Sequence, residues 1–265
     1  MKSLRLAQGI LLDMDGTFFL GERLLPGALE FLALLNRLRI PFSFLTNNTS
    51  RSRADYVKKL MGFGVREADA RVFTAGDAAI RYLRVNYPGK KICLIGTRSL
   101  RDDFRAAGVR LDGRRPDALV LGYDTELTYA KLVRLCRFAR QGLPYFATHP
   151  DINCPTPDGL IPDIGAMMAL VEKSTGRVPD KIFGKPDRNL IEQLAGSLNV
   201  RPESLVMVGD RLYTDIAMGT TAGVGTVLVL SGETKREDLP GAAYRPDFVC
   251  EDLAELGRML EAERG

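Results

Sequence analysis

The sequence lacks the residues and segments on which several classes of protein depend. Its 265 residues include a single histidine, no tryptophan and four cysteines. The cysteines (Cys93, Cys136, Cys154 and Cys250) lie far apart and form no CxxC pair. Such a set is too poor in nitrogen and sulfur ligands for a zinc site. We therefore expect reduced thiols in a reducing compartment, which indicates a cytoplasmic protein.

Long apolar runs and concentrated charge are also missing. No run approaches the roughly 18 apolar residues of a membrane span, and residues 1–8 lack the apolar stretch of a signal peptide. The net charge is only +4, and the 37 basic residues are scattered. Four basic residues within one predicted helix are spaced three positions apart (Lys131, Arg134, Arg137 and Arg140). Such spacing is typical of a solvated helix face. We expect neither a membrane nor a nucleic acid as partner.

Apolar residues make up 45% of the chain, and they occur in strand-like runs that alternate with segments of helical spacing. Short strand-like runs occur at 10–12, 42–45, 92–95, 118–121, 145–147, 205–208 and 227–230. Segments with helical spacing occur at 27–39, 51–61, 77–86, 99–107, 128–140, 164–172, 189–198, 214–220 and 252–261. Strands that alternate with helices predict an α/β protein with a parallel sheet.

Two carboxylates follow the first apolar run directly. Asp13 and Asp15 stand two apart, so in an extended chain they share a side, and Gly16 allows a sharp turn after them. In open α/β sheets, ligands bind at the carboxyl ends of the strands. By itself this fragment is equally compatible with an acidic turn at a strand end.

Three further polar segments follow a strand or precede a helix. They are Thr46-Asn47, Gly184-Lys185-Pro186-Asp187, and Gly209-Asp210 with Asp215. Each segment alone is a weak signal, because such residues often serve as caps or turns. Together the four supply an oxygen nucleophile, a second carboxylate, a hydroxyl, a cation and further acidic groups. Phosphoryl transfer requires this combination.

In order and spacing, these segments resemble the four motifs of the haloacid dehalogenase (HAD) superfamily. The first motif is Asp13-Met14-Asp15-Gly16-Thr17, and the others are Thr46-Asn47-Asn48, Gly184-Lys185-Pro186, and Gly209-Asp210 through Asp215. The chain is most similar to the NagD-like, p-nitrophenylphosphatase-type branch over nearly its whole length. At two positions the chain differs from many relatives, with His149 in place of Asn and Asp163 in place of Gly. The resemblance therefore does not assign a relative's substrate to this chain.

The resemblance implies a HAD-like, doubly wound parallel sheet (a Rossmann-like core) with an inserted α/β cap domain of the C2a type. We assign the core to residues 1–77 and 181–265 and the cap to residues 78–180. The active site is expected in the cleft between them, where closure of the cap excludes water. The sequence leaves open whether the chain forms a homo-oligomer through the cap.

The resemblance also assigns roles to the motif residues. Asp13 is the nucleophile that forms an aspartyl-phosphate, and Asp15 is the general acid and base. Mg²⁺ is the implied cofactor, held by the Asp13 carboxylate, the Asp15 backbone carbonyl and Asp210. Thr46, the Asn47 backbone and Lys185 are the implied phosphate ligands. Asp215 either orients Lys185 or a metal-bound water, or is a plain helix-start carboxylate. Arg211 is expected to be a surface residue.

The segment 148–163 is predicted to be a loop without regular structure. It is rich in proline, including Pro155, Pro157 and Pro162, and is longer than most connections, which favours a functional role. We expect it to select the phosphate ester through His149, Asp151 and Asn153, helped by Asp158 and Asp163. For His149, a structural or surface role is the competing interpretation.

The predicted function is Mg²⁺-dependent hydrolysis of small phosphate monoesters, with p-nitrophenyl phosphate as an artificial substrate. Sugar phosphates, nucleoside monophosphates, pyridoxal phosphate and phosphoglycolate all stay open as substrates. Two alternatives use similar groups. A phospho-acceptor signalling module would need neither Asp15 as an acid nor a large insertion. A phosphomutase would transfer phosphate between positions of one sugar. Dehalogenation is disfavoured, because breaking a carbon–halogen bond makes no use of an acid at Asp15.

Overall fold

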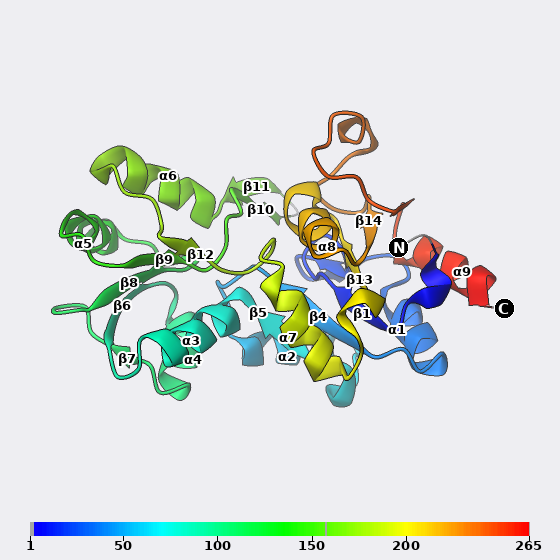
Figure 1. Ribbon diagram of the computed structural model, residues 1–265. Coiled ribbons are helices and arrows are strands. Elements are labelled where there is room, and N and C mark those ends of the chain that lie inside the picture. Colours follow the sequence, from blue (N-terminus) through cyan, green and yellow to red (C-terminus); the bar gives the residue numbers. More distant parts are fainter. Residues whose placement is uncertain (1–2, 157, 265) are drawn as a thin grey trace.

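The computed structural model describes residues 3–156 and 158–264 and contains two parallel β-sheets, one toward each end of the molecule (Figure 1). The six-stranded sheet has the order β15-β14-β13-β1-β4-β5, so the first strand lies near its centre. Its strands are β1 (Gly9–Leu12), β4 (Phe42–Thr46), β5 (Val72–Thr74), β13 (Leu205–Gly209), β14 (Gly225–Val229) and β15 (Phe248–Cys250). The predicted doubly wound parallel fold is confirmed.

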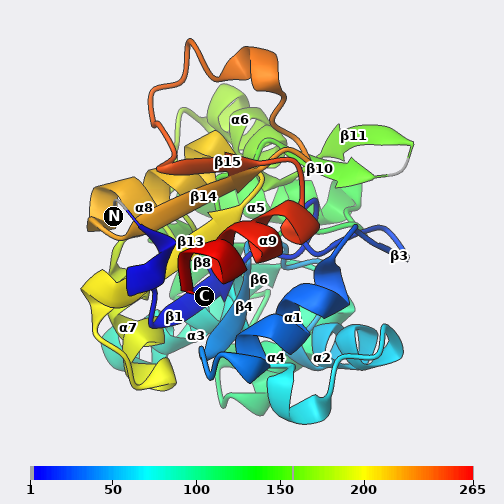
Figure 2. The same cartoon turned by 90° about the vertical axis from the view of Figure 1, so that its right-hand side faces the viewer.

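Helices cover both faces of this sheet (Figure 2). Along β1, Ile10 and Leu12 face one hydrophobic core, and Leu11 faces the other. This alternation explains why the strand is a continuous apolar run. The helices α1 (Ala28–Arg37), α2 (Arg53–Gly62) and α9 (Leu253–Arg264) pack on the first face, and α7 (Asn189–Leu198) and α8 (Ala217–Ala222) on the second.

The five-stranded sheet has the order β12-β9-β8-β6-β7 and is also parallel. Its strands are β6 (Lys91–Ile95), β7 (Arg110–Leu111), β8 (Ala118–Leu121), β9 (Tyr145–Ala147) and β12 (Lys181–Ile182). Helices α3 (Ala75–Asn86) and α4 (Arg98–Ala106) pack on one face, and α5 (Tyr129–Arg140) and α6 (Ile164–Thr175) on the other. Strand β12 belongs to this sheet although its residues, 181 and 182, lie beyond position 180, the predicted end of the cap.

The segment 148–163, predicted as a loop, contains an antiparallel hairpin instead, and a second short hairpin lies within 18–26. In the segment 148–163, β10 (Asn153–Thr156) pairs with β11 (Gly159–Pro162). Prolines concealed this hairpin, but in an isolated two-stranded ribbon each strand is an edge, where a missing N–H costs little. Pro157 lies outside the described residues. In the segment 18–26, the short strands β2 (Phe19–Leu20) and β3 (Arg23–Leu24) pair.

The sequence pattern also missed β5, β7, β12 and β15, which have only two or three residues each and give no periodicity to detect. Helix α2 takes its N-cap from Ser52. The segment predicted as a helix from residue 214 begins with a π-helical turn over Leu212–Ile216. Among the described residues, every helix is too short or too polar to cross a bilayer.

Candidate active site

The predicted site residues meet at the carboxyl edge of the six-stranded sheet. Asp13 follows β1, Thr46 ends β4, and Asp210 follows β13, which are three adjacent strands. Lys185 enters from the segment between β12 and α7. The fold therefore brings together groups from four separate parts of the chain, as expected for strand ends in a parallel sheet.

Lys185 is the cation at the centre of this group and is only 2% exposed. Its ammonium donates to the Asp13 carboxylate and to the Leu45 carbonyl at 3.2 Å, and it forms an ion pair with Asp215 at 2.8 Å. Burial by itself lowers the pKa of Lys185, but the charges of Asp13 and Asp215 outweigh it and raise this pKa above its ordinary value. Lys185 therefore stays protonated against the carboxylates.

The side chain of Asn47 fixes the Lys185 backbone. The Lys185 N–H donates to Asn47 Oδ1 at 2.7 Å, and Asn47 Nδ2 donates to the Lys185 carbonyl at 3.0 Å. Gly184 is left-handed at φ +71°, and a Cβ there would come within 2.5 Å of Asn47 Oδ1. Because the Asn47 side chain is engaged in this way, its backbone is the part left for a substrate.

The carboxylates of Asp13, Asp210 and Asp215 form a cluster in which one oxygen from each lies within 4.8 Å of the others. Asp210 is fully buried; its Oδ2 accepts from the Glu233 N–H at 2.7 Å, while Oδ1 has no hydrogen-bond partner among the described residues. Burial and the charge of Asp13 raise the pKa of Asp210 well above its ordinary value. A divalent cation fits this cluster, because it would satisfy the unpaired oxygen and offset the repulsion.

Two glycines make room for the Asp210 carboxylate. A Cβ on Gly16, which adopts φ +89°, would overlap it, and so would a Cβ on Gly232. The glycine in the first motif therefore does more than turn the chain. It lets the β1 loop approach Asp210 closely.

Asp15 lies beside Asp13 with its Oδ2 buried and without a partner among the described residues. Burial, followed by the negative charge of Asp13, raises the pKa of Asp15 to about 6. A carboxyl group with this pKa exchanges a proton readily near neutral pH, which suits a general acid and base.

The prediction that Arg211 is a surface residue is wrong. Its side chain is about 90% buried, forms an ion pair with the Asp151 carboxylate and lies 3.0 Å from Glu233. Asp151 also accepts from Asn47 Nδ2 at 2.9 Å. Arg211 follows β13 next to Asp210, so its place at the carboxyl edge was a signal in the sequence. Asp151 and Arg211 tie the segment before the β10–β11 hairpin to the first sheet.

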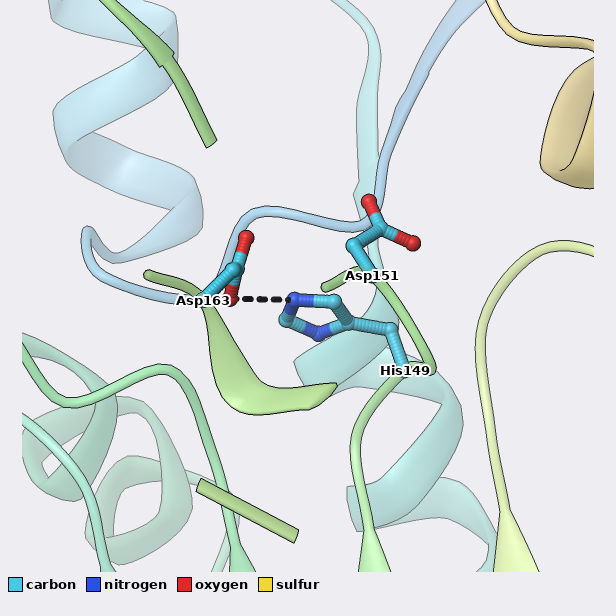
Figure 3. A group of neighbouring side chains, drawn as sticks. All are labelled: His149, Asp151 and Asp163. Atoms are coloured by element: carbon cyan, nitrogen blue, oxygen red, sulfur yellow. Dashed lines mark hydrogen bonds and ion pairs between the residues drawn. The ribbon is translucent and has the colours of Figure 1, made fainter. Parts of the chain in front are cut away.

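His149 is fully buried and hydrogen-bonded through both ring nitrogens (Figure 3). Nδ1 lies 3.0 Å from the Thr148 hydroxyl, and Nε2 lies 3.1 Å from Asp163 Oδ1. The structure therefore supports the structural interpretation of His149 over direct contact with a substrate.

The site residues line a cavity of about 20 Å³. Its lining comprises Asp13, Asp15, Thr46, Asn47, Asn48, Asp151, Cys154, Asp163, Lys185 and Arg211. Of these, sequence reasoning assigned no role to Asn48, Cys154 or Arg211. Asn153 and Asp158 are not part of the lining. A cavity of this size holds about one water molecule and is smaller than a phosphate ester.

Comparisons with known proteins agree with this geometry. The haloacid dehalogenase-like hydrolase family model matches residues 10–110, and a HAD-hydrolase-like model matches residues 182–256. The 5'-nucleotidase YutF of Bacillus subtilis is 32% identical over 94% of this chain and 96% of its own.

Solved structures are similar over most of the chain. A 4-nitrophenylphosphatase from Thermotoga maritima superposes with a TM-score of 0.91 at 45% identity, covering 96% of this chain and 98% of that one. A glycerol phosphate phosphatase from Mycobacterium tuberculosis, solved in complex with calcium, gives a TM-score of 0.85 at 31% identity. It covers 98% of this chain and 76% of that one.

Proposed function

Because the chain belongs to the haloacid dehalogenase-like hydrolase family and is a phosphatase of small phosphate substrates, we propose that it hydrolyses phosphate monoesters through an aspartyl-phosphate on Asp13. The observation that carries this proposal is the pairing of Asp13 with Lys185 in a small cavity whose lining also includes Asp15. A nucleophile, a fixed cation and a carboxyl group of raised pKa therefore face the same small space.

In the proposed mechanism, the Asp13 carboxylate attacks phosphorus while the bond from phosphorus to the leaving oxygen breaks. Asp15 gives its proton to the departing alcohol and then takes a proton from the water that hydrolyses the phosphoaspartate. Lys185 and the Thr46 hydroxyl hold the phosphoryl oxygens together with the Asn47 backbone. Asp215 keeps Lys185 in place, 2.8 Å from its ammonium.

Phosphatases of this family generally use a divalent metal, and we propose Mg²⁺ for this chain. The Asp13 and Asp210 carboxylates and the Asp15 backbone carbonyl would hold it. When bound, Mg²⁺ neutralises charge between Asp13 and the phosphate. Without such help, each pair of unit charges at ~4 Å repels by about 4 kcal/mol at an effective dielectric of ~20.

We also propose that residues 78–180 form a cap whose 148–163 segment selects the ester, while residues 1–77 and 181–265 carry the chemistry. The buried Arg211–Asp151 ion pair supports a cap that closes directly over the site. A cytoplasmic location and assembly through the cap stay predictions.

Measuring phosphate release from a panel of monoesters in the presence of Mg²⁺ tests the proposed function. We expect repeated turnover and no transfer of labelled phosphate between positions of a sugar. A single burst of phosphate without turnover would favour a signalling module instead. Transfer of label would favour a phosphomutase.

Asp15→Asn is expected to slow the hydrolysis of alkyl phosphates by roughly 10²–10⁴-fold. Hydrolysis of p-nitrophenyl phosphate should slow much less, because nitrophenolate departs with little need of a proton. The comparison requires kcat for both esters in the same preparation. Equal losses on the two esters would mean that Asp15 supports the site rather than supplying the proton.

Gly232→Ala is expected to raise the Mg²⁺ concentration needed for half-maximal activity by about tenfold or more. The added Cβ would overlap the Asp210 carboxylate and displace a proposed ligand. Gly241→Ala is the matched control, since a Cβ there would have no atom within 4 Å. An unchanged Mg²⁺ requirement in Gly232→Ala would argue against Asp210 as a ligand.

A further inference from the structure

A chain of hydrogen bonds ends at Asp163, a carboxylate in the lining of the cavity. The Tyr123 N–H donates to Thr49 Oγ1 at 2.9 Å, and the hydroxyls of Thr49 and Thr148 lie 3.1 Å apart. The chain continues from Thr148 to His149 Nδ1 at 3.0 Å and from His149 Nε2 to Asp163 Oδ1 at 3.1 Å. It connects the loop after β4 to the start of α6.

The groups in this chain determine the direction of its hydrogen bonds. Because an ionised carboxylate only accepts, His149 Nε2 donates to Asp163. In neutral His149, Nδ1 then accepts from Thr148, which accepts from Thr49. Every donor has an acceptor in this arrangement. A protonated His149 would donate to Thr148 and leave one of the two threonine hydroxyl hydrogens, on Thr49 or Thr148, without an acceptor among the described residues. The neutral Nε2–H form therefore fits best.

The same bonds occupy one oxygen of Asp163 and leave the other free. Oδ1 accepts from His149 and, at 2.5 Å, from the Ile164 N–H at the start of α6. Oδ2 accepts no hydrogen bond within the described part of the chain and points away from the imidazole (Figure 3). Asp163 is only 2% exposed and lines the cavity with Asp13 and Asp15.

Other carboxylates near His149 are not free in this way. Both oxygens of Asp151 are engaged, one by Asn47 and one by Arg211. One ligand atom from each of His149, Asp151 and Asp163 could be grouped within 4.8 Å, as in a metal site. However, the ligand atoms of His149 and Asp151 are already hydrogen-bonded to other groups of the protein. The arrangement therefore presents one acceptor oxygen, Asp163 Oδ2, rather than a metal centre.

We propose that Asp163 is a specificity-determining residue that accepts a hydrogen bond from the leaving alcohol, and that His149 is the positioning residue that aims it. The preferred esters then carry a hydroxyl or ammonium group on the leaving part. Esters with a second acidic group are rejected, because a carboxylate repels another anion and cannot donate to it. This inference rests on the proposed hydrolysis of monoesters.

Asp163→Asn tests the inference by replacing one hydrogen-bond acceptor, Oδ2, with a donor. The side-chain oxygen of Asn keeps the bonds from His149 and Ile164, so the amide NH₂ takes the place of Oδ2 and donates instead of accepting. The substrates are glycerol 3-phosphate and 3-phosphoglycerate, which share a carbon skeleton but end in a hydroxymethyl or a carboxylate group. The ratio of their kcat/KM values should shift toward 3-phosphoglycerate by about tenfold or more.

Two controls accompany this variant. Hydrolysis of p-nitrophenyl phosphate, which has no hydroxyl for Asp163, should stay within about threefold. Asp102→Asn makes the same chemical change at an exposed residue of α4, outside both the cavity lining and the 148–163 segment, and should leave the ratio unchanged. If even the unaltered protein hydrolyses no monoester, the proposed function fails. If it does and Asp163→Asn leaves the ratio unchanged, only the specificity inference fails.

His149→Phe and His149→Gln test the positioning role. Phe fills the site without a donor, so KM for glycerol 3-phosphate should rise about tenfold with little change in kcat. The Gln amide can donate to Asp163 and should restore part of the loss. Equal losses on glycerol 3-phosphate and p-nitrophenyl phosphate in both variants, or no rescue by Gln in a folded protein, would overturn the assignment.

Discussion

Asp13→Asn is expected to lower kcat for every phosphate monoester by about 10⁴-fold or more, the range seen when a covalent nucleophile is removed. Asn has nearly the same shape as Asp, but its amide is a far poorer nucleophile and brings no charge to a cation. The two other carboxylates of the acidic cluster cannot replace it simply. Asp210 is fully buried, and Asp215 is held by Lys185 and the Arg211 N–H.

The Asp13→Asn variant should nevertheless fold. Lys185 keeps its ion pair with Asp215 and its bond to the Leu45 carbonyl, so the buried ammonium is not left alone. Asp210 also loses a neighbour of like charge. Thermal unfolding checks this point, and Asp102→Asn, at an exposed position of α4, serves as the control for the chemical change. Hydrolysis above a few per cent in a folded, contaminant-free preparation would refute Asp13 as nucleophile.

Removal of divalent metal is the second change for which we expect a near-complete loss of activity. After treatment with EDTA, phosphate release should fall below about 1%, and Mg²⁺ should restore it. The reason is the cluster of Asp13, Asp210 and Asp215, where the negative charges of the protein add to those of the phosphate. Titration of the chelated protein with Mg²⁺ measures the effect.

Adding Ca²⁺ tests the same metal site by competition with Mg²⁺. Ca²⁺ takes the same oxygen ligands, but its larger and more flexible shell does not favour in-line geometry. It should therefore bind in competition with Mg²⁺ and inhibit. Full activity in the presence of chelator would contradict the Asp13–Asp210 site.

The central strands and most helices could be predicted from the sequence, for a simple physical reason. Strands β1, β4 and β13 are buried on both faces and so appear as short, mostly apolar runs. In a parallel sheet the carboxyl ends of such strands share one edge. The convergence of Asp13, Thr46 and Asp210 therefore followed from the chain order, and the residue types indicated phosphoryl transfer.

The partners of the buried charges were decided only by the tertiary structure. Arg211 pairs with Asp151, 60 residues away, and Asn47 binds Lys185, 138 residues away. Local patterns describe which residues a segment contains, but they do not give distances between segments. The surface assignment of Arg211 failed for this reason, and the competing interpretations of His149 stayed open.

The same limit applies to burial and its consequences. The raised pKa of Asp15, the unpaired oxygen of Asp210 and the free oxygen of Asp163 depend on how completely neighbouring segments exclude water. The β10–β11 hairpin was hidden by its prolines, whose cost depends on whether a strand lies at an edge. The sequence by itself determined which chemical groups reach the edge of the sheet. Packing between distant segments decided which of them are charged, paired or free, because desolvation and hydrogen bonding exist only in the folded chain.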